Sequence, residues 1–482
     1  MNPLEVIRVI GVLLVATAAA MLPSVPFAVG EGVVVAWLGA VALVGGVGAA
    51  AWWATPPVGG INAREGVVIV GLGWVAVVLA GSLPFLFTGV APTVASAVFE
   101  SASGFTTTGA TVFPTIEDLP PSILLWRSVT HWIGGMGIIV LGVAILPLLG
   151  VGGAQLFQAE VPGITADRLA PRIATTARLL WGVYVLLTAV LGALYLGLGM
   201  TPFDAANHAM STLATGGFST RTVSMAAFSP AIQWVTVFFM FVAGVNFTLH
   251  YRVLTGRWRA WFRDAEWRWY CASTVGVSLV VFAALWVEQG AGSPEALRHA
   301  VFNTVSIHST TGFATADFAQ WPSLAQVLLL GLMFVGAMGG STGGGLKVVR
   351  AAVVAEHIRG EVRKVLHPRA IVVTRLGRTP VRSEIVLNVL AFLGMYVATH
   401  AAGTVALTAL GSDLVTALSA VLAAMSSIGP GLAAVGPAAH YGHLGDPALL
   451  VLSALMLLGR LEFYTLLVLF LPGVWTRAGG KR

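Results

Sequence analysis

Residues 301–315 read VFNTVSIHSTTGFAT, and three other stretches of the chain share this pattern. They read SAVFESASGFTTTGAT at 96–111, ANHAMSTLATGGFST at 206–220 and LSAVLAAMSSIGPGL at 418–432. In each stretch a mildly apolar segment is followed by Ser or Thr residues and then by glycine. Aligned on Gly109, Gly216, Gly312 and Gly429, the stretches are 107, 96 and 117 residues apart. Self-similarity at such a period predicts a tandem of four structural repeats.

The composition around these stretches is that of a membrane protein. Of the 482 residues, 57% are hydrophobic and only 10% are charged, whereas a soluble domain carries about 25% charged residues. The single cysteine, Cys271, excludes a disulfide framework and a metal site built on thiolates. We therefore expect membrane lipid to surround most of the chain.

Ten apolar runs predict ten full transmembrane helices, since about 20 apolar residues span the hydrocarbon core. They cover residues 6–27, 32–54, 66–88, 122–149, 178–199, 230–252, 270–288, 323–350, 383–409 and 447–473. The first is interpreted as a retained helix, because no clear signal-peptide cleavage site follows it. Each of the four related stretches lies between two of the last eight runs.

The predicted fold class is an all-α membrane protein with four repeated helix–pore loop–helix units around one pore. Two extra transmembrane helices precede these units. The predicted divisions are 1–60 for the extra helices, then 61–165, 166–262, 263–368 and 369–482 for the four repeats.

Lys and Arg give the orientation of the helices. With the N-terminus in the cytoplasm, 22 of the 26 cations fall in cytoplasmic segments, as the positive-inside rule requires. Only Arg127, Arg221 and Arg298 fall outside, while Arg460 lies within a span. Both termini are then cytoplasmic and all four loops lie on the outer side. Because topology accounts for the positive charge, we expect no nucleic-acid partner.

Each related stretch begins with a short helix that has its own start signal. Ser293-Pro294-Glu295 supplies an N-cap, a proline at the first helical position and an acid in the first turn. Thr201-Pro202 and Ser412-Asp413 repeat this pattern, and Pro92 does so more weakly. Helices of about 10–14 residues are too short to span the bilayer. They are typical of re-entrant segments, whose extended backbone is tolerated at membrane depth where it lines a cavity.

The loops that follow these helices have the chemistry of a potassium filter. Rings of backbone carbonyls replace the water of a dehydrated potassium ion, glycine permits the backbone that exposes them, and Thr and Ser add uncharged oxygens. The predicted potassium site comprises Thr107, Thr108, Gly109, Ala214, Thr215, Gly216, Thr310, Thr311, Gly312, Ser427, Ile428 and Gly429. Helix packing by small residues is the alternative, but four such loops after capped short helices favour a filter.

The chain resembles the Trk/Ktr/HKT superfamily of potassium transporters, and within it the bacterial TrkH-type membrane subunit. The resemblance is carried by the four loops, HWIGGMGIIVLGVAILPLLGVGGAQLFQAEVPG with RLAPRIATTAR, GAMGGSTGGGLKVVR and GRLEFYTLLVLF. It implies a homodimer with one pore per protomer in the bacterial cytoplasmic membrane. It also implies a cytoplasmic TrkA-type regulatory subunit that binds the nucleotide, so no organic cofactor is expected in this chain. The basic segments 251–269 and 356–382 are candidate docking surfaces, although ordinary positive-inside loops account for their charge equally well.

Two further features suggest a gate. A glycine-rich string interrupts the eighth span, and five glycines in seven residues disfavour a regular helix. The residues are Gly339, Gly340, Ser341, Thr342, Gly343, Gly344 and Gly345. The string does not fit a phosphate loop, because Lys347 lacks the required Gly-Lys-Ser/Thr arrangement. The resemblance places a gate here, and a packing kink is the alternative.

Arg460 lies mid-span, where a charge is costly unless it faces water or a partner. Facing the pathway it would repel a cation, and the superfamily has such a pore arginine. An ion pair with Glu462 is the alternative, although neighbours at i,i+2 do not share a helix face.

The predicted function is gated potassium uptake through a selective pore. The alternative is a symporter coupled to protons or sodium, which usually needs an intramembrane carboxylate such as Glu462. An enzyme is not expected, since His208 and His308 lie near Ser and Thr without a placed acid partner.

Overall fold

The computed structural model describes residues 2–56, 63–144, 169–289 and 294–470. These residues form helices joined by short loops, with a single pair of two-residue strands among them. The predicted all-α class is thus confirmed. The predicted divisions at 60/61 and 165/166 lie outside the described residues, as do Ser293 and residues 145–149 and 471–473 of two predicted spans.

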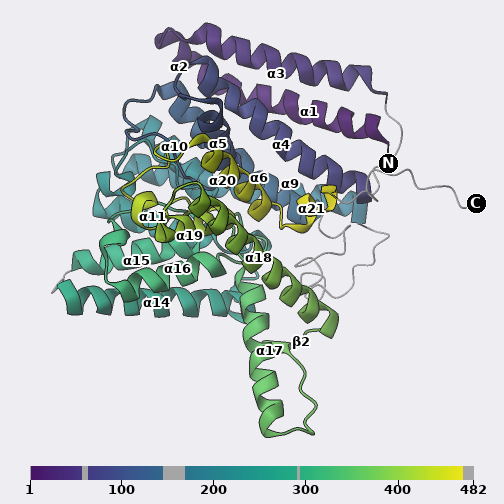
Figure 1. The fold of residues 1–482 in the computed structure, drawn as a ribbon, viewed down its shortest axis with the longest axis vertical. Coiled ribbons are helices and arrows are strands. Elements are labelled where there is room, and N and C mark those ends of the chain that lie inside the picture. The colour runs from purple at the N-terminus through teal and green to yellow at the C-terminus, as the bar shows by residue number, and fades with distance from the viewer. Residues whose placement is uncertain (1, 57–62, 145–168, 290–293, 471–482) are drawn as a thin grey trace, which may run out of the picture.

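The N-terminal residues form a helical pair beside the rest of the molecule (Figure 1). α1 (Pro3–Met21) continues through η1 (Leu22–Ser24) into α2 (Val25–Gly30), and α3 (Val34–Ala54) returns along it. Gly11 and Gly48 allow the two backbones to touch, because a Cβ on Gly48 would lie 2.7 Å from the Gly11 carbonyl oxygen. Glu31 then ties the pair to the first repeat by accepting a hydrogen bond from the Ser122 backbone N–H at 2.8 Å.

Each repeat consists of a long helix, a short helix, a central loop and a second helix. The first repeat has α4 (Ala63–Phe87), α5 (Val94–Phe105) and α6 (Pro121–Ala144), and the second has α9 (Leu169–Gly197), α10 (Pro202–Leu213), η3 (Ser224–Ala227), α11 (Pro230–Ala243), α12 (Phe247–Leu254) and α13 (Arg259–Arg263). The third has α14 (Ala265–Gln289), α15 (Pro294–His308), η4 (Phe318–Gln320), α16 (Ser323–Val335), α17 (Val348–Leu366), β1 (Arg375–Leu376) and β2 (Thr379–Pro380). The fourth has α18 (Ser383–Ala409), α19 (Leu414–Ser426), η5 (Ala433–Val435), α20 (Asp446–Arg460), α21 (Tyr464–Leu467) and η6 (Val468–Phe470).

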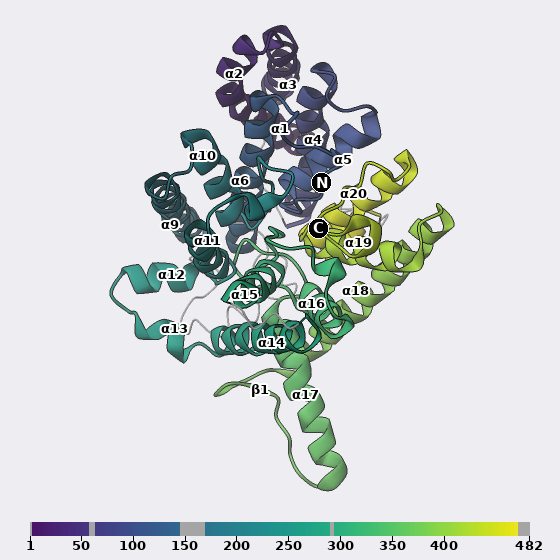
Figure 2. The same cartoon turned by 90° about the vertical axis from the view of Figure 1, so that its left-hand side faces the viewer.

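The repeats surround a common centre in chain order (Figure 2). The second helix of each repeat contacts the short helix of the next, in the pairs α6–α10, α11–α15, α16–α19 and α20–α5. The last pair closes the ring between the fourth and first repeats. The predicted arrangement of four units around one axis is therefore confirmed.

Three predicted spans are wrong as continuous helices. α11 ends at Ala243 and meets α12 at an angle of 103°. α16 ends at Val335, because Gly336 has φ +71° and leaves the helical path, and a loop at 336–347 separates it from α17. α20 ends at Arg460, where Glu462 and Phe463 both have positive φ.

Six helices among the described residues are long and apolar enough to cross a membrane, and the bent α11–α12 pair would make a seventh. The number of ten crossings stays a prediction.

The start signals of the short helices are largely as predicted. The Thr201 side chain accepts a hydrogen bond from the Asp204 N–H, and Asp413 accepts from the Val415 and Thr416 N–H groups. In the first repeat the cap is Thr93, one residue after Pro92, and it accepts from the Ser96 N–H. These side chains satisfy helix N–H groups that have no partner within the helix.

α17 projects away from the helical body (Figures 1 and 2). The chain returns from its tip through β1 and β2, which pair antiparallel with Arg375 opposite Pro380. The predicted basic segment 356–382 therefore forms most of this projection. Its far end is exposed, with Ile371 at 95%.

Candidate functional site

The four short helices end in the same unusual conformation. Their last turns lead into one residue each in the left-handed region, with φ between 53° and 59°: Thr107, Thr215, Thr310 and Ser427. In each case this residue's N–H bonds the carbonyl three residues back, and the next N–H bonds the carbonyl five residues back. Left-handed backbone costs a non-glycine residue about 1–2 kcal/mol. Four equivalent strained residues at one place indicate a functional centre.

A glycine with positive φ follows two residues after each strained residue. These are Gly109, Gly217, Gly312 and Gly429, with φ of 80°, 81°, 82° and 93°. The predicted alignment of the second loop on Gly216 is therefore off by one residue. Thr215, Gly216 and Gly217 correspond to Thr107, Thr108 and Gly109, and Ala214 only caps α10. The sequence offered two adjacent glycines, and only the backbone distinguishes their roles.

The four loops touch one another in a closed ring. A Cβ added to Gly109 would collide with the Gly216 carbonyl oxygen. The other three glycines meet the next repeat in the same way: Gly217 with the Thr311 oxygen, Gly312 with the Ile428 oxygen and Gly429 with the Thr108 oxygen. Four equivalent carbonyls, from Thr108, Gly216, Thr311 and Ile428, thus lie where successive repeats meet. We call residues 106–112, 214–220, 309–315 and 427–432 central loops 1 to 4.

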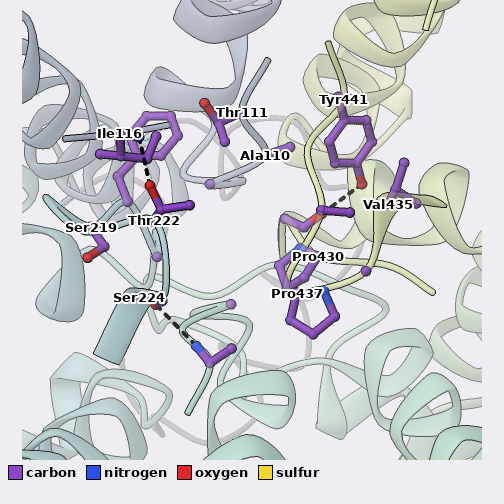
Figure 3. A pocket seen from close by; sticks show the side chains of 18 of the residues that line it. Ala110, Thr111, Ile116, Ser219, Thr222, Ser224, Pro430, Val435, Pro437 and Tyr441 are labelled. Carbon is purple, nitrogen blue, oxygen red and sulfur yellow. Dashed lines mark hydrogen bonds between the residues drawn. The ribbon is translucent and has the colours of Figure 1, made fainter. Parts of the chain in front are cut away.

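A cavity of about 80 Å³ opens on one side of the ring, and all four positive-φ glycines line it. Its wall is held by cross-connections that the sequence analysis missed (Figure 3). The Tyr441 hydroxyl donates to the Gly429 carbonyl at 2.7 Å, and the Thr222 hydroxyl accepts from the Ile116 N–H at 2.8 Å. Ser224 accepts from the Ala314 N–H at 3.2 Å. These residues come from the connections after the central loops, where local sequence gives no signal.

The 336–347 loop touches the strained residues themselves. The Gly344 N–H donates to the Thr310 hydroxyl at 2.8 Å, and the Thr215 hydroxyl donates to that of Thr342 at 3.2 Å. A Cβ on Gly344 would collide with the Ser426 carbonyl oxygen. The loop is therefore packed directly against the ends of three of the four short helices.

The other two strained residues carry unpaired hydroxyls. Thr107 and Ser427 have buried side-chain oxygens without a hydrogen-bond partner among the described residues. A buried hydroxyl without a partner is costly in protein interiors. These two hydroxyl oxygens lie beside the ring, where they are free to act as oxygen ligands.

All seven residues of the predicted glycine-rich string lie in the 336–347 loop, which starts earlier and ends later than predicted. Its two ends are held together by Glu266, whose Oε1 accepts from the Gly339 N–H at 2.6 Å and the Val349 N–H at 3.1 Å. Its middle is held by Thr342, whose hydroxyl lies 3.1 Å from the Leu213 carbonyl oxygen. The Lys347 ammonium donates to the Gly343 carbonyl.

Arg460 lies next to this loop. Its side chain is buried, and its Nη1 donates to the Thr342 carbonyl at 2.7 Å. The alternative of an ion pair with Glu462 is wrong, because Glu462 pairs with Arg350 at 2.6 Å. That pair joins residues 112 apart in the chain, which sequence reasoning had no means to connect.

The two histidines considered for catalysis have structural partners. His208 Nε2 lies 2.9 Å from Ser219 Oγ, while its Nδ1 bonds the Asp204 backbone carbonyl. His308 Nδ1 lies 2.7 Å from Thr274 Oγ1. Both connect helices and loops around the ring.

Comparison with known proteins gives the same picture. The model of the TrkH family of cation transport proteins matches residues 38–474. The "Trk system potassium uptake protein TrkH" of Vibrio parahaemolyticus is 43% identical over 86% of this chain and 87% of that protein. The protein of the same name from Halomonas elongata is 39% identical over 98% of this chain and 99% of that protein.

A solved structure agrees along almost the whole length. The crystal structure of the potassium transporter TrkH from Vibrio parahaemolyticus has a TM-score of 0.91 and 38% sequence identity, covering 99% of this chain and 100% of that chain. These relatives are transport proteins, as expected for a chain without enzymatic function. The chain belongs to the TrkH family of cation transport proteins, and it is a multi-pass integral membrane protein.

Proposed function

We propose that this chain takes up potassium through the ring of central loops. The observation that carries the proposal is the closed ring itself, in which every positive-φ glycine abuts a carbonyl oxygen of the next repeat. The proposed filter comprises Thr107, Thr108, Gly109, Thr215, Gly216, Gly217, Thr310, Thr311, Gly312, Ser427, Ile428 and Gly429. The names of the relatives, potassium uptake proteins, support the same cargo.

The chemistry of the ring suits a dehydrated monovalent cation. Carbonyl oxygens replace the hydration shell, and the unpaired hydroxyls of Thr107 and Ser427 supply further oxygen ligands on its path. The C-terminal ends of α5, α10, α15 and α19 meet at the ring, and their negative dipole ends favour a cation there. No charged side chain is required for binding.

The 336–347 loop and Arg460 are proposed as the gate. The loop packs against central loops 2 and 3 and is anchored by the buried Arg460 guanidinium. Residues 336–347 do not line the cavity, so the proposed gate lies on the other side of the ring. The proposal includes a homodimer in the bacterial cytoplasmic membrane with both termini in the cytoplasm. It also includes a nucleotide-binding regulatory subunit that docks on residues 251–269 and 356–382.

Uniport through a pore is favoured over symport. Coupling to protons or sodium needs an intramembrane carboxylate that can change its state. Two acids near the proposed route are held in ion pairs, the largely buried Glu462 by Arg350 and the fully buried Glu100 by Arg127. Reversal potentials in reconstituted vesicles test this: they should follow the potassium gradient alone, and a dependence on the proton gradient at fixed potassium would support symport.

The filter is tested by cation flux through the wild type and a Gly312→Ser variant, with and without the regulatory subunit. Gly312 has φ +82° and lies against the Ile428 carbonyl oxygen, so a side chain there displaces the ring. The wild type should prefer potassium to sodium, and the variant should lose most of that preference. An unchanged preference in the variant would mean that the filter lies elsewhere.

A further inference from the structure

A buried ion pair lies behind central loops 1 and 2. Glu100 on α5 and Arg127 on α6 meet at 2.7 Å, with side chains 0% and 2% exposed. Glu100 lies seven residues before the strained Thr107. Glu100 has no exposed surface and lies behind the ring, whereas Arg127, almost as deeply buried, also lines the cavity that opens on it.

Glu100 holds central loop 1. Its Oε2 accepts from the Val112 N–H at 3.1 Å, and its Oε1 accepts from the Thr111 hydroxyl at 3.1 Å. These bonds hold the Thr111 side chain and the Val112 backbone, two and three residues beyond Gly109. The outer end of central loop 1 is thus tied to a carboxylate on its own short helix.

Arg127 holds central loop 2. Its Nη1 donates to the Ser219 carbonyl at 3.3 Å, and its guanidinium lies 3.9 Å from the centre of the Phe218 ring. The His131 ring stacks on the same phenyl ring at 4.0 Å and 13°. Because both groups lie about 4 Å from the ring centre, they occupy opposite faces. Phe218, the residue after Gly217, is clamped between two side chains of α6.

The equivalent positions in the other repeats are built differently. Seven residues before each strained residue lie His208, Asn303 and Ala420. His208 contacts the Ser219 hydroxyl, and Asn303 donates to the Thr315 hydroxyl at 3.2 Å. Each of these supports only its own central loop. Among the residues that the structure describes, Glu100–Arg127 is the one ion pair that holds two central loops at once; Tyr441 joins central loops 4 and 1 by neutral hydrogen bonds instead.

We propose that Glu100 and Arg127 are positioning residues that set cation specificity. They fix the separation of central loops 1 and 2, and with it the spacing of the Thr108 and Gly216 carbonyls, without touching the ion. This inference rests on the proposed potassium filter. A buried ion pair resists deformation, because separating the charges leaves each one poorly solvated. It therefore prevents the two loops from closing around a smaller ion.

The test is the potassium-to-sodium permeability ratio, measured from reversal potentials of the reconstituted full-length protein. Glu100→Gln keeps the shape of the side chain but loses the charge, and should lower the ratio by about tenfold. Arg127→Lys keeps the charge and the pairing with Glu100. It loses the fork that reaches Ser219 and the planar face on Phe218, and should lower the ratio by a smaller factor of about threefold.

A matched control is Glu295→Gln. Glu295 begins the short helix α15 and pairs with Arg298 at 3.3 Å, but its side chain is 69% exposed. The same substitution in an exposed pair should leave the permeability ratio unchanged. A double variant, Glu100→Gln with Arg127→Gln, restores a neutral hydrogen-bonding pair and should recover part of the ratio lost in Glu100→Gln.

The outcomes separate the two proposals. If the wild type does not prefer potassium, the proposed function fails. If the wild type prefers potassium and both Glu100→Gln and Arg127→Lys keep its ratio, the positioning role is wrong. Should Glu100→Gln not fold, by size-exclusion profile in detergent, the Arg127→Lys ratio alone decides. A fall in total flux at constant ratio also overturns the inference, since it indicates a merely structural role.

Discussion

The first and third repeats share the structure of the short helix and central loop but differ in the helix that follows. In both, a short helix ends in a strained threonine and a positive-φ glycine, Thr107 with Gly109 and Thr310 with Gly312. Beyond the ring, α6 of the first repeat continues without interruption for 24 residues. α16 of the third repeat stops after 13 residues, and the 336–347 loop follows. The repeats therefore share one structure at the ring, whereas the helix that follows the central loop is continuous in the first repeat and interrupted in the third.

The breaks in the second and fourth repeats explain how that loop is tolerated. Irregular backbone at membrane depth needs partners within the protein. The Met338 N–H donates to the Gly244 carbonyl at 3.1 Å, just past the end of α11, and the Phe247 N–H donates to the Gly340 carbonyl at 3.0 Å. Arg460, at the end of α20, donates to Thr342. Three interrupted helices thus satisfy one another, while the uninterrupted α6 contributes only the Gly134 carbonyl, which accepts from Arg460 at 3.5 Å.

The largest expected effect comes from Arg460→Gln. It removes a charge-assisted hydrogen bond to the Thr342 carbonyl, worth about 1.5–3 kcal/mol. If the 336–347 loop is the gate, its open fraction should rise about 10- to 150-fold. Potassium flux into vesicles without the regulatory subunit measures this.

Arg460→Lys separates two roles of the side chain in that experiment. Lysine keeps the charge near the route but loses the reach and fork of the guanidinium. A flux raised by both substitutions indicates that the hydrogen bond holds the loop, and one raised by glutamine alone indicates an electrostatic barrier. Wild-type flux in Arg460→Gln would contradict both.

Gly344→Ala should have a somewhat smaller effect. The new Cβ collides with the Ser426 carbonyl oxygen, and overpacking of this kind costs about 1–3 kcal/mol. The packed position of the loop is then disfavoured, and flux should rise about 5- to 150-fold. Gly331→Ala is the matched control, because nothing lies within 4 Å of its Cβ in α16. Equal flux in the two variants would show that the packed loop does not limit transport.

Thr342→Val should have the smallest effect. Valine removes the hydroxyl that contacts the Leu213 and Ala243 carbonyls but keeps the backbone carbonyl that Arg460 binds. A neutral hydrogen bond contributes about 0.5–1.5 kcal/mol, so flux should rise about 2- to 10-fold. Thr404→Val removes a hydroxyl bonded only within its own helix and should leave flux unchanged. If Thr342→Val raised the flux more than Arg460→Gln, the Thr342 hydroxyl and not Arg460 would be the stronger anchor of the loop.

Sequence reasoning succeeded where the signal is local. The caps Thr201 and Asp413 lie next to the helices that they begin, and the glycine-rich string disfavours a helix by its own composition. It failed where tertiary structure decides. The choice of Gly217 over Gly216 depends on φ, and the Arg350–Glu462 pair depends on two helix breaks far apart in the chain. The tyrosine that holds Gly429 lies 12 residues downstream, in a connection without periodicity.

The ring also fixes the order of events during synthesis. Its closing contacts join the last repeat to the first: the Thr93 hydroxyl donates to Asp446 at 2.8 Å, and the Tyr441 N–H donates to the Thr111 carbonyl at 2.8 Å. Central loop 1 therefore lacks its contacts with the fourth repeat until some 330 further residues have been synthesised. A nascent chain that stalls before Tyr441 leaves this edge without its partners, and exposed edges of this kind favour aggregation.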